Sequence, residues 1–160
     1  MVNKNGIANS QVLTIAGGLI SIISVFLPWF SARATAAASG EVSTLSVNGL
    51  GTINGSGMLL GLVSGKIGWE FQGIGVLALG IASIAVALLL REKLQSIAMS
   101  ACGLLIIGGG VVNLVSIESF SGDIMGATIV SGIGYGLYVV VIAGAVAVAG
   151  GIFAWRDINR

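Results

Sequence analysis

The sequence contains no histidine, one cysteine and one proline. Without histidine, the chain lacks the commonest metal ligand and the commonest general base at neutral pH. The lone Cys102 excludes a disulfide within the chain, and neither a second thiol nor an adjacent base accompanies it. We therefore predict a protein that is not an enzyme, with no catalytic residues, no cofactor and no metal site.

Charged residues are also scarce, because they make up 8% of the chain, against about 25% in an ordinary soluble domain. Hydrophobic residues make up 56%. So few charges cannot cover the surface of a water-soluble globule, which predicts a protein embedded in a lipid bilayer. The net charge of +1 leaves no basic surface for nucleic acid.

Four apolar stretches are each long enough for a helix to cross about 30 Å of hydrocarbon. They cover residues 12–30, 72–90, 97–117 and 133–155, and none contains Asp, Glu, Lys or Arg. The sequence therefore predicts a single membrane domain over residues 1–160, built as an all-α four-helix transmembrane bundle. The outer loops are expected at residues 31–71 and 118–132.

The distribution of basic residues predicts the orientation of these spans. Five of them, Lys4, Arg91, Lys93, Arg156 and Arg160, fall on the side of the two termini, against Arg33 and Lys66 on the other side. The positive-inside rule then places both termini in the cytoplasm of a multi-pass cell-membrane protein. Aromatic residues favour the headgroup zone, so Trp29, Trp69 and Tyr135 are expected as anchors at the outer interface and Trp155 at the inner one.

Residues 26–40, "FLPWFSARATAAASG", resemble a signal-peptidase site. The preceding apolar run is longer than a signal peptide needs, and only Lys4 precedes it, so we expect a retained span that ends near Pro28. The Ala-rich stretch is predicted to be a flexible hinge leading into the first outer loop.

The first outer loop carries a strand-like pattern, since Leu45 and Val47 alternate with Thr44 and Ser46. Asn48–Gly49 is a favoured two-residue turn, so we predict a small β-hairpin or sheet here. Residues 58–63 are apolar and are expected to pack on the outer rim of the bundle. Asn54 begins an Asn-Gly-Ser motif, which is a possible glycosylation acceptor.

Small residues recur at helical spacing in every span, which allows the close helix contacts that hold membrane bundles together. The expected helix-packing positions are Gly17, Ser21, Ala78, Ala82, Gly103, Gly110, Ala143, Ala147 and Gly151. Ala143, Ala147 and Gly151 are predicted to share one face of the fourth span. Surplus small faces could bind other subunits.

Four spans, internal termini and a long β-prone first loop resemble the claudin-like tetraspan proteins. Trp29 followed by Gly49–Leu50 is similar to part of that family's Trp and Gly-Leu-Trp signature. Gly51 stands where the second Trp belongs, and the two loop cysteines are absent. The resemblance therefore implies the family's topology but not a paracellular barrier or channel.

We predict a structural or accessory membrane subunit that contacts the lipid bilayer and assembles with itself as a homo-oligomer or with other membrane subunits. The helices would supply packing faces, and the first outer loop would supply a recognition surface. The alternative is a small channel or transporter for a neutral solute, with Asn113, Thr14, Ser21 or Ser24 facing the path. Asn113 could equally bond across helices.

Overall fold

The computed structural model describes residues 9–57, 70–90, 92–117, 119–124 and 126–159, and four long apolar helices dominate these ranges. They are α1 (Asn9–Phe26), α3 (Glu70–Leu89), α4 (Glu92–Ser116) and α5 (Tyr135–Ile158). Each is long and apolar enough to cross a membrane. The predicted four-helix bundle is thus confirmed, and the chain is a multi-pass membrane protein.

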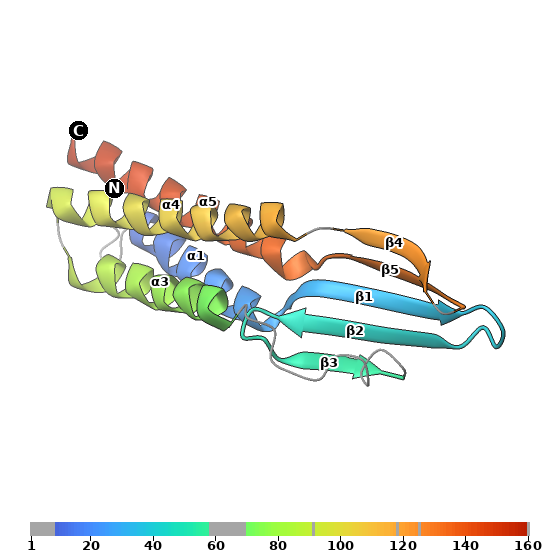
Figure 1. Cartoon of the computed structure of the whole chain (residues 1–160). Coiled ribbons are helices and arrows are strands. Elements are labelled where there is room, and N and C mark those ends of the chain that lie inside the picture. Colours follow the sequence, from blue (N-terminus) through green and yellow to red (C-terminus); the bar gives the residue numbers. More distant parts are fainter. Residues whose placement is uncertain (1–8, 58–69, 91, 118, 125, 160) are drawn as a thin grey trace.

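The second structural unit is a five-stranded antiparallel sheet that projects from one end of the bundle (Figure 1). Its strands are β1 (Pro28–Ala36), β2 (Val42–Asn48), β3 (Ile53–Ser56), β4 (Phe120–Ile124) and β5 (Ala127–Ile133). They are ordered β3-β2-β1-β5-β4. The beginning of α1, the end of α3, the beginning of α4 and the end of α5 lie at the opposite end of the bundle.

The sheet confirms the β structure predicted between the first and second spans, and the segment between α4 and α5 contributes β4 and β5 to it. Residues 28–36 are not a flexible hinge, because they form the central strand, paired with both β2 and β5. Alanine has low strand propensity, so pairing on both sides determines this conformation rather than local preference. The first helix ends at Phe26, because Pro28 disfavours helical geometry at the residue before it.

The turn between β2 and β3 is longer than the two residues predicted. Residues 49–52 connect the strands, and the Asn48 side-chain oxygen accepts hydrogen bonds from the Leu50 and Thr52 amides at 3.0 and 2.9 Å. The positive φ of 75° falls on Gly51 instead of Asn48 and Gly49. The apolar residues 58–63, expected on the rim, lie outside the described residues.

The helices bury small and polar residues and expose large apolar ones, which is the reverse of a soluble helix. The buried residues of α1 are Ser10, Thr14, Gly17, Gly18, Ser21, Ser24 and Val25. Its exposed large residues are Val12, Leu19, Ile23 and Phe26. Lipid is the solvent that such a surface fits, and small residues are what lipid-embedded helices use to pack.

The helix α5 packs along both α1 and α4, and it does so through two different small faces. Ala143 and Ala147 lie against Gly17 of α1, whereas Gly151 lies against Ser96 and Ser100 of α4. The single ridge predicted for Ala143, Ala147 and Gly151 is therefore divided between two neighbours, because 100° of rotation per residue separates positions eight apart by about 80°.

The tight α4–α5 contact yields a testable difference between two glycines of α4. A Cβ at Gly103 would lie 2.7 Å from the Val148 backbone nitrogen, whereas a Cβ at Gly108 would meet nothing within 4 Å. We expect Gly103→Ala to reduce the free energy of unfolding by about 1–3 kcal/mol through overpacking. Thermal unfolding in detergent measures this effect as a lower Tm.

The matched control is Gly108→Ala, which should leave the Tm unchanged or raise it slightly, because alanine favours helix by about 1 kcal/mol over glycine. Equal melting temperatures for the two variants would contradict the close α4–α5 contact.

Candidate functional site: the extramembrane sheet and its junction with the bundle

The two central strands of the sheet are direct continuations of two packed helices. Only Leu27 separates α1 from β1, and only Gly134 separates β5 from α5. The β1–β5 register runs from Phe30↔Ile133 at the membrane end to Ala36↔Ala127 at the far end. The antiparallel pair α1–α5 thus passes into the antiparallel pair β1–β5 with no intervening loop.

Hydrogen bonds from the sheet satisfy carbonyl groups at the end of α1. The last turn of a helix leaves carbonyls without partners inside the helix. The Trp29 indole nitrogen donates to the Ser24 carbonyl oxygen at 2.9 Å, and the Gly49 amide donates to the Val25 carbonyl oxygen at 2.8 Å. The β2–β3 turn and the start of β1 therefore cap this helix.

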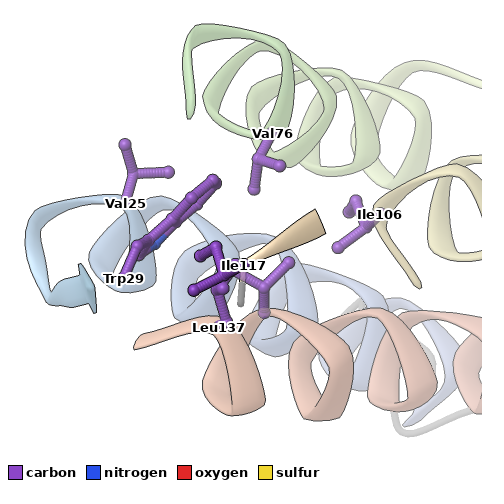
Figure 2. Packing of buried hydrophobic residues seen from close by; sticks show 7 residues of the cluster. Val25, Trp29, Val76, Ile106, Ile117 and Leu137 are labelled. Carbon is purple, nitrogen blue, oxygen red and sulfur yellow. The ribbon is translucent and has the colours of Figure 1, made fainter. Parts of the chain in front are cut away.

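Trp29 lies in the core of the junction and not on the lipid-facing surface, which corrects its predicted role as an interfacial anchor. Its side chain is fully buried and packs in a cluster with residues from all four helical segments (Figure 2). The cluster comprises Val25, Trp29, Val76, Ile106, Ile117, Leu137 and Val140. The β1–β2 register shifts between Pro28 and Phe30, and such a bulge redirects a side chain, here toward the bundle.

Glycines allow the chain segments at this junction to approach backbone to backbone. A Cβ at Gly134 would clash with the Pro28 carbonyl oxygen, and one at Gly73 with the Gly49 carbonyl oxygen. A Cβ at Gly136 would lie 2.8 Å from the same Pro28 oxygen. These contacts join the sheet to α3 and α5, and the capping hydrogen bonds join it to α1, so the sheet is fixed to the bundle at three helices.

The sheet has one apolar and one polar face, as expected from the two-residue period of a strand. Ala32, Ala34 and Leu45 are buried on the apolar face, together with Phe30, Ile53 and Ile129. The polar face carries a hollow of about 500 Å³ over β2, β1 and β5. Its lining includes Ser31, Arg33, Thr44, Ser46 and Val130.

Arg33 supplies the charge of this hollow. It is exposed between Thr44 and Val130, its direct neighbours on the two flanking strands. Within the described part of the chain, its guanidinium has no hydrogen-bond or ion-pair partner. The carboxylate of Asp123 accepts a hydrogen bond from Thr128 at 2.5 Å on the outer β4–β5 pair. The hollow therefore presents an available cation surrounded by hydroxyl groups.

The other predicted packing residues occupy different environments. Ser21 is buried and donates to the Val76 carbonyl oxygen of α3 at 3.4 Å. Gly110 is buried against Val140 and Val141, and Ala82 is half-buried. Ala78 is exposed to the surroundings of the bundle, because α3 turns Gly80 and Ser83 toward α1 instead.

The remaining predicted surface residues are placed as follows. Tyr135 and Trp155 are 59% and 46% exposed, as residues that contact an interface need to be. Asn54 is exposed on the edge strand β3, and its glycosylation stays a prediction. Trp69 lies outside the described residues.

The polar residues proposed for a solute path all bond to backbone carbonyl groups. Thr14 donates to Ser10 and Ser24 donates to Ser21 within α1, at 3.1 and 2.6 Å. The Asn113 amide donates to the Gly109 carbonyl oxygen of its own helix at 2.7 Å. All are buried within the bundle, where their donors are satisfied by backbone carbonyl groups.

Comparison of the chain with protein-family models finds no match, and comparison with curated proteins finds none either. Among the residues described, no three His, Cys, Asp or Glu side chains lie close enough together to hold a metal ion.

Sequence reasoning missed Arg33 and Gly134. The alternation of Ser31, Arg33 and Thr35 with Ala32 and Ala34 is a two-residue period that would have identified Arg33 as part of a polar strand face. No local signal distinguishes Gly134 from the other glycines, since its role depends on the carbonyl of Pro28 from a distant segment.

The junction predicts that substitution of Gly134 is destabilising, whereas substitution of Gly132, two residues earlier, is tolerated. Gly134→Ala should reduce the free energy of unfolding by about 1–3 kcal/mol, because its Cβ meets the Pro28 carbonyl. It should also make β1 and β5 more sensitive to protease. Gly132→Ala should have neither effect, because its Cβ would lie 3.8 Å from its nearest neighbour, Ser119. Melting temperatures and limited proteolysis of both variants in nanodiscs test this prediction. A protease-resistant Gly134→Ala variant would contradict the close backbone contact at the junction.

Proposed function

We propose that this protein is a non-enzymatic membrane subunit whose extramembrane sheet recognises a partner, either a second copy of the chain or another membrane protein. Both termini would lie in the cytoplasm and the sheet on the opposite side. The observation that carries the proposal is the hollow on the polar face, where the exposed Arg33 has no acidic partner among the described residues.

A recognition surface must hold its shape before the partner arrives, because ordering it on binding would weaken the complex. The capped end of α1 and the close contacts at Gly73, Gly134 and Gly136 hold the sheet in one position on the bundle. Arg33 and the surrounding hydroxyls offer directional hydrogen bonds. A guanidinium surrounded by hydroxyl groups can bind carboxylate or carbonyl groups on the surface of a partner.

The bundle offers a second surface that suits association. Gly75 and Ala78 are exposed on α3, and a Cβ at Gly75 would meet nothing within 4 Å. Small residues on a lipid-facing surface let another helix approach closely. Self-assembly or docking beside another subunit is therefore compatible with both the sheet and the helices.

Conduction of a neutral solute is the less favoured function. Thr14, Ser24 and Asn113 each donate to a carbonyl oxygen of their own helix. A permeation path needs polar groups that exchange their partners with the solute. The observed bonds instead support a packing role for these residues.

The likeness to the claudin-like proteins extends to four spans and an antiparallel sheet after the first helix. We propose no barrier role from it. In this chain, Trp29 packs in the core of the junction and caps α1. Pairing of β1 with β5, and not a disulfide, holds the sheet together.

A photo-crosslinking experiment tests the recognition role. A benzophenone amino acid at Val130, on the polar face, should form discrete protein adducts in native membranes. The same group at Val12 on α1 should react mainly with lipid, although both positions are 53% exposed. An adduct of twice the chain mass identifies self-assembly, and another mass identifies a different subunit.

Substitution of Arg33 tests whether its charge contributes to recognition, and the same substitution at Arg156 is the matched control. Arg33→Glu should reduce the Val130 adduct severalfold, whereas Arg156→Glu at the opposite end of the bundle should not. A Val130 probe that captures no protein, together with a lone monomer on native gels in several mild detergents, would contradict the proposal.

A further inference from the structure

A groove of about 390 Å³ runs between α4 and α5 near the end of the bundle opposite the sheet. Ser96, Ile97, Ser100, Ala101 and Leu104 line it from α4, and Ile152 and Trp155 line it from α5. Its large apolar side chains are exposed, between 46% for Trp155 and 60% for Leu104. The groove therefore opens toward the hydrocarbon of the bilayer.

Small residues produce this groove. Gly151 brings the two helices together beneath it, and the Ser96 hydroxyl donates to the Gly151 carbonyl oxygen at 2.9 Å. The Ser96 hydroxyl at the floor of the groove therefore already has a hydrogen-bond partner within the protein. The groove is thus suited to binding an apolar chain. Ala101 is exposed beside it and fills little of the space.

Two cationic side chains lie at the end of the groove that faces the membrane surface. Lys93 precedes Ile97 by four residues, and Arg156 follows Ile152 by four, so each shares a helix face with a groove residue. Both are exposed. The acidic neighbour Asp157 is displaced by about 100° around α5 from Arg156.

We propose that this groove binds an anionic phospholipid. One acyl chain lies along Ile97, Leu104 and Ile152, and the phosphate lies between Lys93 and Arg156. The charge complementarity selects a lipid over another helix, because a helix would need acidic residues facing both cations. This inference is independent of the proposed role of the sheet.

The test is native mass spectrometry of the full chain in detergent, titrated with dioleoyl phosphatidylglycerol or dioleoyl phosphatidylcholine. We expect the anionic lipid to bind at least fivefold more tightly. Lys93→Gln and Arg156→Gln should each weaken its binding about fivefold, which corresponds to one surface charge. Neither should change the binding of phosphatidylcholine. Arg33→Gln, which removes one charge from the sheet, should have no effect on either lipid.

A second pair of variants tests the acyl-chain site. Ala101→Phe fills the groove and should weaken the binding of both lipids, whereas Leu105→Phe, at an exposed position outside the groove, should not. The soluble headgroup glycerophosphoglycerol should not bind at the same concentrations. If Ala101→Phe does not fold, the charge variants decide alone.

Three results would overturn the proposal. One is equal affinity for the two lipids, and another is an unchanged affinity for the anionic lipid in both charge variants. The third is loss of a protein oligomer in Ala101→Phe without any change in lipid binding, which would assign the groove to a second copy of the chain.

Discussion

The close contact between α1 and α5 is the constraint on which the rest of the molecule depends. Helix axes ordinarily lie 8–10 Å apart, whereas paired strands lie about 4.8 Å apart. A helix pair can pass into a strand pair across one residue on each side only if the helices approach unusually closely. Gly17 against Ala143 and Ala147, and Gly150 against Ser10 and Thr14, provide that approach. Gly134 then allows the backbones to meet where the strands begin.

The same contact explains why the sheet is fixed to the bundle although it projects beyond the helices. The carbonyl groups at the end of α1 accept hydrogen bonds from the Trp29 indole and the Gly49 amide, so the helix terminus is completed by the sheet. The cluster around Trp29 then joins α1 to α3, α4 and α5. The polar face and Arg33 extend from this base, which fixes their position relative to the helices.

The sequence predicts the coarse architecture well because lipid imposes simple rules on it. Apolar length identifies four spans, and the alternation around Leu45 identifies a strand. The strand β1 is harder to predict, because its Ala-rich half has little strand propensity and becomes a strand only through pairing. Thr128, Ile129 and Val130 do favour a strand in β5, but residues 118–132 are predicted only as a loop between two spans. Trp29 is predicted at the interface because aromatic residues favour that depth, and only its bulge and its bond to Ser24 reveal a core residue. The alternation of polar residues with alanine places Arg33 on a polar strand face, but only the cross-strand register places it beside Thr44 and Val130.

The central claim is that the sheet and the bundle form one rigid body through β1–β5 and α1–α5. Pulsed electron spin resonance between nitroxides at Thr44 on the sheet and Val12 on α1, in a Cys102→Ser background, measures this directly in lipid nanodiscs. The account predicts a single narrow distance distribution that is the same in detergent and in lipid. A broad or multimodal distribution, with the helices still folded, would contradict it.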